Sequence, residues 1–299
     1  MGRIFEPNNN HHFPFTGISL VRRGFLRKFL VVSHLNDTTD LEMNTQPAFY
    51  LKKWYLDCIG SDGAARIWYC VLLKYRGITL HYNNALLLLP GQPVQSRTSF
   101  RRRPEPLADG NIVVWKPPFL RENAVFSTHF PAVEQELFAS SEGVVRWRCL
   151  APAATVSHSA FSGKGYVEQM EMTIPPWRLP IDVLRWGRAH CDGQAAVWID
   201  WQGEISQRCV WINGCEDSAC TVADNNICWG DGKTLALTPE QVIRQGRVVS
   251  TVLRKIPLLS GLLPPELAAM HEAKFLGHAM LTNGSTSYGK AIYETVRFR

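Results

Sequence analysis

The sequence contains no apolar run long enough to cross a membrane as a helix. Its longest apolar stretches, residues 85–89 and 256–263, fall far short of the roughly 20 residues that such a span needs. Residues 22–32 mix basic and apolar side chains, but they lack the apolar core and the small-residue cleavage site of a secretion signal. These absences predict a cytoplasmic protein, with peripheral contact to a membrane surface left open.

Motifs that hold nucleotides or metals are also missing. The chain has no glycine-rich phosphate loop, no dinucleotide-binding fingerprint and no G-x-S-x-G nucleophile motif. Four of its eight cysteines, at positions 209, 215, 220 and 228, lack the paired C-x2-C spacing of zinc sites. We therefore expect no cofactor, no metal and mostly reduced, buried cysteines. A disulfide between Cys215 and Cys220 is the alternative.

Positively charged residues only slightly outnumber negatively charged ones. The 299 residues include 32 Lys and Arg against 26 Asp and Glu, a net charge of +6 without a long basic tract, so nucleic acid is not an expected partner. Arg101, Arg102 and Arg103, flanked by Pro104 and Pro106, form the one compact basic cluster. These arginines could contact an anionic lipid or substrate, but such a run is more often a solvated loop, and we assign them no site.

Helical periodicity is scarce, and turn signals typical of β-hairpins are frequent. Only residues 239–246 and 264–273 read as helices. Six Asp-Gly or Asn-Gly pairs supply the positive φ that tight hairpin turns require, and runs rich in Val, Ile, Trp, Tyr and Thr flank several of them. The pairs are Asp62-Gly63, Asp109-Gly110, Asp192-Gly193, Asn213-Gly214, Asp231-Gly232 and Asn283-Gly284.

The spacing of these hairpins predicts an all-β chain with two tandem antiparallel barrels and few short helices. Closure into barrels is how a sheet of many antiparallel strands removes its edges, and eight to ten strands leave room for about one small ligand. We place a poorly ordered, polar tail at residues 1–42, the first barrel at 43–162 and the second barrel at 163–299.

Two of the turns predict a strand register. A two-residue loop at the first Asp-Gly pair puts Tyr55 opposite Cys70. The same loop at Asp192-Gly193 puts Arg185 opposite Asp200, which predicts a cross-strand ion pair.

The other face of this second hairpin combines aromatic, aliphatic and polar side chains. Its apolar members indicate an interior, which is either a filled aromatic core or a cavity for an apolar ligand. Alternation brings together Leu184, Trp186, Arg188, His190, Val197, Ile199 and Trp201. The proline-rich segment 175–180 cannot be a central strand and must bridge or cover other elements. The residues predicted to contact a ligand are Trp186, Arg188, His190, Trp201, Trp177, Arg185 and Asp200.

The most distinctive motif is Gly-Lys-Gly-Tyr-Val-Glu at residues 163–168. Its glycines allow a close backbone approach, and Tyr166 and Glu168 share one face of a strand because they are two residues apart. A carboxyl group in an apolar cavity is protonated more easily because desolvation disfavours its charged form. Glu168, with Tyr166 beside it, is therefore the predicted proton donor. The alternative is a structural salt bridge between Glu168 and Arg185 or Arg188.

This motif, the proline-rich segment and the following Trp-Gly-Arg strand give residues 48–299 a family resemblance. The chain resembles the hydroxyneurosporene synthase/AttH-like group of lipocalin-like proteins, which includes carotenoid 1,2-hydratases and tocopherol cyclase relatives. The resemblance implies two calycin-type barrels, an apolar cavity and isoprenoid or polyketide-like substrates. It also implies that Glu168 stands where the carotenoid hydratases have a proton-donating aspartate. The sequence departs from their Asp-His-Asn run in having Glu168-Gln169-Met170.

Two functions follow as alternatives. The first is an enzyme that hydrates or cyclises an alkene of isoprenoid or polyketide type, with Glu168 as acid and a hydrophobic small molecule as partner. The second is a non-catalytic lipocalin-like carrier or sensor of a hydrophobic ligand. A Glu168 that faces an enclosed cavity, without an arginine or lysine at bidentate distance, favours the first. A Glu168 locked to Arg185 or Arg188, or a filled barrel, favours the second.

Overall fold

The computed structural model describes residues 48–117, 123–158, 161–217, 219–230, 232–251 and 265–298. The expected tail at residues 1–42 lies outside the described residues, as does Asp231 of the fifth turn pair.

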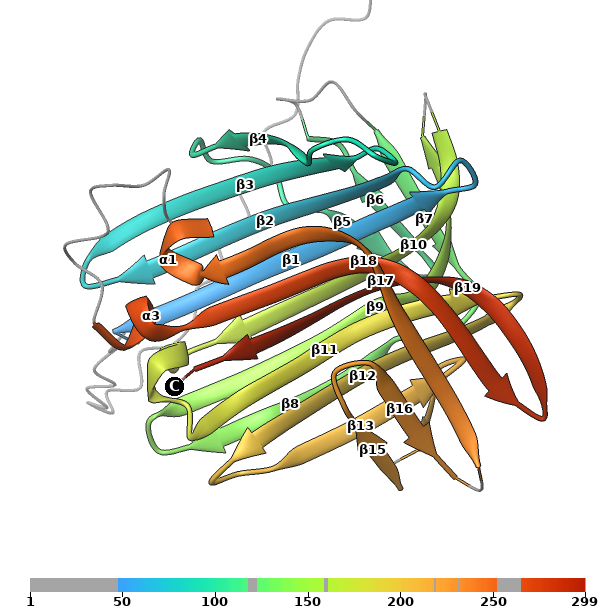
Figure 1. Cartoon of the computed structure of the whole chain (residues 1–299). Coiled ribbons are helices and arrows are strands. Elements are labelled where there is room, and N and C mark those ends of the chain that lie inside the picture. The colour runs from blue at the N-terminus through green and yellow to red at the C-terminus, as the bar shows by residue number, and fades with distance from the viewer. Residues whose placement is uncertain are drawn as a thin grey trace, which may run out of the picture. The chain divides into compact units, whose positions relative to one another are not determined.

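The first part of the described chain forms one antiparallel sheet of ten strands. They are β1 (Phe49–Gly60), β2 (Ala65–Tyr75), β3 (Ile78–Leu88), β4 (Gln95–Ser99), β5 (Leu107–Asp109), β6 (Ile112–Trp115), β7 (Ala124–Thr128), β8 (Val133–Ser140), β9 (Gly143–His158) and β10 (Phe161–Met172). The order is β4-β3-β2-β1-β10-β9-β7-β6-β5, with β8 paired to β9. The first strand therefore pairs with the last, as in a meander that curls into a barrel (Figure 1).

A second sheet of nine strands repeats this plan. Its strands are β11 (Ile181–Cys191), β12 (Gln194–Gly203), β13 (Gln207–Ile212), β14 (Cys215–Asp217), β15 (Cys220–Val222), β16 (Asn226–Trp229), β17 (Lys233–Arg247), β18 (His271–Asn283) and β19 (Ser285–Arg297). The order β14-β13-β12-β11-β19-β18-β17-β16-β15 again joins first and last strands. The predicted fold class, all-β with two tandem antiparallel, barrel-like sheets and few short helices, is confirmed.

The described helical elements are short. They are the 3-10 turn η1 (Pro176–Arg178), α1 (Val248–Thr251) and α3 (Pro265–Ala269). No described helix has the length and apolarity that a bilayer crossing needs. The predicted helix at 264–273 is confirmed over Pro265–Ala269, but the one at 239–246 is wrong, because this segment belongs to β17. Two register shifts in β17 absorb its irregular sequence around Pro239.

Strand β10 belongs to the first sheet, because it pairs with β1 on one side and β9 on the other. The strand that carries Tyr166 and Glu168 thus completes the first sheet instead of opening the second, which begins at β11. The expected boundary at residue 163 falls inside β10. The sequence of a motif does not show which other strands its own strand pairs with. Only the observed pairing shows that the second sheet begins after β10.

The predicted register of the first hairpin is wrong by one residue. Tyr55 faces Tyr69, not Cys70. The reason is a three-residue loop, closed by a hydrogen bond from the amide of Gly60 to the carbonyl of Ala64, with Gly63 at a φ of 80° as its last residue. The Asp-Gly pair is therefore part of a longer turn.

The predicted register of the β11–β12 hairpin is confirmed. Asp192 and Gly193 both have positive φ, as a two-residue type I′ turn requires, and Arg185 faces Asp200. The predicted ion pair is present, with Nη1 of Arg185 3.1 Å from Oδ2 of Asp200.

Four clusters of buried side chains form the interior, and the smallest consists of Leu267, Met270 and Val296. One contains Trp68 and Trp115 and consists of first-sheet residues, and another contains Trp198 and Trp229 and consists of second-sheet residues. The third joins both sheets. Each barrel therefore has its own core, and the two sheets also bury a face against each other.

Candidate functional site

A cavity of about 350 Å³ lies between the two sheets. Strands β1, β2, β3, β8, β9 and β10 line it from the first sheet, and β11, β12, β17, β18 and β19 line it from the second. The lining is mostly aliphatic, and it includes Leu51, Val71, Leu73, Leu80, Val145, Met170, Leu184, Ile199, Leu267 and Val296. Such a lining with a few polar groups is typical of a small-molecule site.

Glu168 lines this cavity and is 2% exposed. One of its oxygens, Oε2, accepts hydrogen bonds from Nε1 of Trp147 at 2.6 Å and from the hydroxyl of Tyr166 at 2.9 Å. The other oxygen, Oε1, lies 3.7 Å from Nζ of Lys53, which also lines the cavity. The side chains of Tyr166 and Glu168 therefore lie on the same face of β10, as their spacing predicts.

The glycines of the motif bring β10 close to β1. A Cβ at Gly163 would lie 2.2 Å from the carbonyl oxygen of Ile59, and one at Gly165 would lie 2.5 Å from that of Asp57. Neither position has room for a larger residue. The predicted close backbone approach is confirmed. It holds β10, the strand that carries Glu168, close against β1.

The predicted alternative of a salt bridge from Glu168 to Arg185 or Arg188 is wrong. Arg185 pairs with Asp200 and with Asp224, at 3.1 and 2.6 Å. Arg188 pairs with Asp57 through Nε at 3.1 Å and through Nη2. Both arginines therefore form their ion pairs with carboxylates other than Glu168.

A buried lysine that the sequence did not point to is a further polar group of the cavity. The charged lining residues are Lys53, Glu168, Arg244, Glu272, Lys274 and Glu294. Nζ of Lys274 donates to the hydroxyl of Tyr69 at 3.1 Å and to Oε2 of Glu294 at 3.0 Å. It also lies 4.3 Å from the ring centre of Tyr55 and 4.9 Å from that of Trp186. This arrangement holds a cation among aromatic ring faces.

Lys274 and Glu294 are both charged. Burial lowers the pKa of Lys274, but the Glu294 carboxylate and the Tyr69 hydroxyl outweigh burial, so the net pKa is raised. Burial alone would raise the pKa of Glu294, yet the Lys274 charge lowers it. The pair is therefore an ion pair at neutral pH and adds no net charge to the cavity.

The pattern that could have revealed this pair lies in the last hairpin. Lys274 of β18 stands directly opposite Glu294 of β19, in the hairpin that turns at Asn283-Gly284. Charged residues in a strand usually face solvent. Only the packing of this face against the first sheet shows that the pair is buried.

Two of the predicted ligand residues, Trp186 and Trp201, line the cavity with unpaired donors. Their indole Nε1 atoms are buried and have no hydrogen-bond partner among the described residues. An indole nitrogen can only donate, so these two groups suit acceptor oxygens on a ligand.

Arg188 and His190 lie on the same strand face as Trp186 but line a different cleft, of about 660 Å³. Arg188 is fully buried in its bidentate pair with Asp57, which joins β11 to β1. Nε2 of His190 contacts the carbonyl of Pro152 at 3.2 Å. Nη1 of Arg188 and Nδ1 of His190 have no hydrogen-bond partner within the described segments.

His190 makes the stability of the fold depend on pH. Burial, followed by the charge of Arg188, lowers the pKa of His190 from 6.5 to about 3. Between these values only the unfolded chain takes up a proton, so stability falls as the pH drops below 6.5. From pH 7 to pH 5 we expect the wild type to lose about 2 kcal/mol more unfolding free energy than His190→Gln. Urea unfolding at both pH values measures this, with exposed His129→Gln as control; equal losses in all three proteins would contradict it.

The remaining predicted ligand residues lie away from the cavity. Arg185 and Asp200 face the opposite side of β11 and β12, where Asp200 also accepts from Nε of Arg208 at 2.8 Å. Trp177 packs edge-on against Phe49 and Tyr75, with ring centres 5.8 and 5.5 Å apart. The segment around Trp177 still bounds the cavity, through Pro176 and Leu179.

The cysteines are free thiols, and six of the eight are buried. Cys215, on the exposed side of β14, forms no disulfide with Cys220. Among the described residues no three His, Cys, Asp or Glu side chains gather as a metal site would require.

Comparison with known proteins gives structural likeness at low identity. No protein-family model matches the sequence, and no curated protein matches it. Similar solved structures include CghA with Sch210972, at 10% identity over 84% of this chain and 89% of that chain, with a TM-score of 0.49. An AttH-like protein from Nitrosomonas europaea has 8% identity over 90% and 98% of the two chains and a TM-score of 0.49. Kievitone hydratase from Nectria haematococca has 7% identity over 84% and 89%, with a TM-score of 0.46.

Proposed function

We propose that this protein binds a hydrophobic, oxygen-bearing small molecule of isoprenoid or polyketide type between its two sheets and transfers a proton to it through Glu168. The observation that carries the proposal is a buried carboxyl group on the wall of a mostly apolar cavity. No arginine is paired to it, and its one lysine contact, Nζ of Lys53 at 3.7 Å, reaches a single oxygen. The reaction class is hydration or cyclisation of an alkene.

The unpaired indole donors support a ligand with acceptor oxygens. Trp186 and Trp201 present their N–H groups from the second sheet, whereas Glu168 lies on the first. A ligand whose carbonyl or hydroxyl oxygens accept from these donors is held at one end and leaves its apolar body against the aliphatic lining.

The hydrogen bonds of Glu168 assign its oxygens different tasks. Oε2 already accepts from Trp147 and Tyr166, which orients the carboxyl group. Oε1 then carries the proton and gives it to an alkene carbon. Water adds to the resulting cation and returns a proton to Oε1, or an internal hydroxyl adds instead and closes a ring. The ring face of Trp201 is available to stabilise the cation, whereas Nζ of Lys274 already lies 4.9 Å from the ring centre of Trp186.

The second candidate function is a non-catalytic carrier of the same kind of ligand. The observation that favours it is Lys53, whose Nζ lies 3.7 Å from Oε1 and can hold Glu168 as a carboxylate. In that case the cavity binds its ligand but Glu168 transfers no proton. Binding and turnover must therefore be measured separately.

The binding part of the proposal is tested by filling the cavity. Leu184 lines the cavity and is half-buried, so Leu184→Trp is expected to weaken binding of the apolar dye Nile red about tenfold, because overpacking costs about 1 to 3 kcal/mol. Leu107→Trp is the matched control, because Leu107 is 72% exposed. Fluorescence titration measures both, and circular dichroism confirms that both variants fold. Equal affinity in the two variants would exclude this cavity as the binding site.

A further inference from the structure

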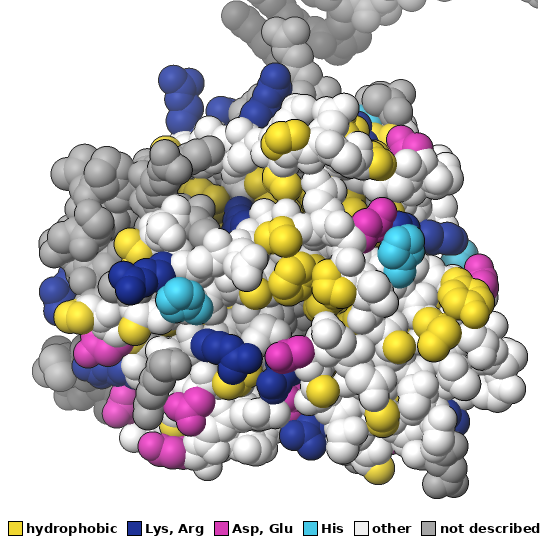
Figure 2. Space-filling view, viewed as in Figure 1, with side chains coloured by type: hydrophobic (Ala, Val, Ile, Leu, Met, Phe, Trp, Pro, Cys, Tyr) yellow, Lys and Arg dark blue, Asp and Glu magenta, His cyan; other side chains and the backbone are white. Residues whose placement is uncertain are grey.

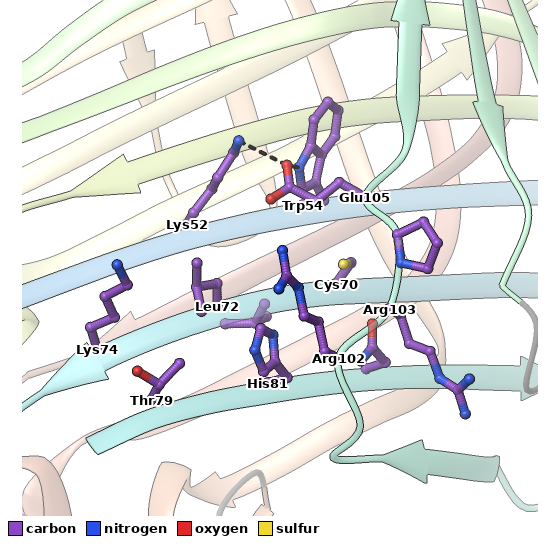
Figure 3. A pocket seen from close by; sticks show the side chains of 13 residues that line it. Lys52, Trp54, Cys70, Leu72, Lys74, Thr79, His81, Arg102, Arg103 and Glu105 are labelled. Carbon is purple, nitrogen blue, oxygen red and sulfur yellow. Dashed lines mark hydrogen bonds and ion pairs between the residues drawn. The ribbon is translucent and has the colours of Figure 1, made fainter. Parts of the chain in front are cut away.

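A second hollow, of about 690 Å³, lies on the other face of the first sheet (Figure 3). We call it the basic groove. Strands β1, β2 and β3 form its floor, and residues 102–105 line it from the loop between β4 and β5. Trp54 and Cys70 on this floor belong to the core cluster of the first sheet, whereas the cavity described above lies between the sheets. The basic groove is thus a separate site.

The loop that carries the three consecutive arginines is fixed at both ends. At one end, Nδ2 of Asn83 on β3 donates to the carbonyl oxygen of Arg101 at 3.1 Å. At the other end, Oε2 of Glu105 accepts from Nε1 of Trp54 on β1 at 3.0 Å and pairs with Nζ of Lys52 at 2.8 Å. The loop therefore crosses from β3 to β1, and Arg102 projects over the floor between the two anchors (Figure 3). The loop is therefore anchored at both ends, while the side chains of Arg101 and Arg102 are exposed, as expected for a solvated loop.

The groove contains positive charge that nothing in it neutralises. Glu105 is its one acidic lining residue, and it is already paired with Lys52. Lys74 and Arg102 have no ion pair within the described part of the chain, and His81 stands between them on the floor. By contrast, acidic and basic side chains are interspersed on the face shown in Figure 2. Cations without a carboxylate partner that line one hollow are typical of an anion site.

A buried acceptor adds a second requirement for the ligand. The side chain of Asn83 is 1% exposed, and its Oδ1 has no donor among the described residues, although its Nδ2 is used by the loop. Asn83 lines the groove. A ligand that satisfies this atom must donate a hydrogen bond, as a hydroxyl group does.

We propose that the basic groove binds a phosphate group that carries a neighbouring hydroxyl, as in a glycerol phosphate. Arg102 and Lys74 supply charged donors to the phosphate oxygens, and Oδ1 of Asn83 accepts from the hydroxyl. This chemistry occurs both in soluble phosphate esters and in the headgroup of phosphatidylglycerol.

The test uses the full chain, glycerol 3-phosphate, and vesicles of phosphatidylcholine with and without phosphatidylglycerol. Arg102→Ala is expected to weaken binding about tenfold, because it removes a charge-assisted hydrogen bond. Arg101→Ala is the matched control, since it removes the same charge one position away and its side chain does not line the groove. Calorimetry measures the soluble ester and co-sedimentation measures the vesicles.

The outcomes separate the two sources of phosphate. Binding of glycerol 3-phosphate that Arg102→Ala weakens and Arg101→Ala leaves unchanged supports the site and assigns it to a soluble ester. Binding only to vesicles with phosphatidylglycerol, with the same difference between the variants, supports the site and assigns it to a lipid headgroup. The proposal is overturned if neither probe binds at millimolar concentration, or if the two variants weaken binding equally. Nile red binding in the other cavity is expected to be the same in both variants.

Discussion

Replacing Glu168 with glutamine is expected to lower turnover by a factor of about 10² to 10⁴, the usual contribution of a general acid. Glutamine keeps the shape of the side chain and an oxygen that accepts from Trp147 and Tyr166, so the cavity and its ligand affinity are retained. What is lost is the proton on the second oxygen. The expected signature is therefore a loss of rate with unchanged binding of Nile red.

The reaction can be followed before its substrate is identified. An apolar extract of the host cells is incubated with the protein in deuterium oxide, and mass spectrometry detects species that gain the mass of D₂O on hydration or a carbon-bound deuterium on cyclisation. Glu171→Gln is the matched control, because Glu171 is on the same strand and is not a lining residue of the cavity. Equal product from Glu168→Gln and the wild type would exclude Glu168 as the acid and leave the carrier function. No product from the wild type, together with intact binding, would also favour the carrier.

Replacing Arg188 with methionine is expected to lower the unfolding free energy by about 3 to 5 kcal/mol, because it leaves a buried charge without its partner. Arg188 and Asp57 are both fully buried, and their pair joins β11 of the second sheet to β1 of the first. Burial raises the pKa of Asp57, and Arg188 is the main influence that opposes this. In the variant Asp57 becomes neutral more easily, so the loss of stability is expected to be smaller at pH 5 than at pH 8.

Urea unfolding of two further variants isolates the effect of the buried charge. The double variant Arg188→Met with Asp57→Leu removes both charges and is expected to recover most of the loss. Arg146 pairs with Glu136, and both side chains are about half exposed. Arg146→Met is therefore expected to lower the unfolding free energy by about 0.5 kcal/mol or less. Equal stabilities of the Arg188→Met variant and the wild type would show that this pair does not hold the sheets together.

The turn residues show why part of the fold could be predicted. Asp192 and Gly193 form a two-residue turn, so the register of that hairpin and its ion pair follow from counting residues. Near Gly63 the same dipeptide type belongs to a three-residue loop, which shifts the register by one. A dipeptide indicates that the chain turns, but hydrogen bonds across the turn determine the loop length.

The candidate site also combines features that the sequence predicts with features that it does not. Tyr166 and Glu168 share a face because of the period of a strand, and Gly163 and Gly165 fit only where another backbone comes close. Lys274 could not be predicted as a site residue, because a lysine in a strand is usually exposed. Its burial depends on Glu294 and on the aromatic rings of the other sheet.

The sequence by itself determined an all-β chain, the alternation of its strands and the motif that presents Glu168. Both faces of β11 carry buried apolar residues, with Ala189 and Cys191 on one and Trp186 on the other. Alternation therefore defines two faces without telling which one meets a ligand. Only the tertiary structure decided that the cavity lies between the sheets and that Arg102 is fixed over a groove. The physical reason is that burial and ion pairing depend on residues far apart in the chain, whereas strand period and turn chemistry are local.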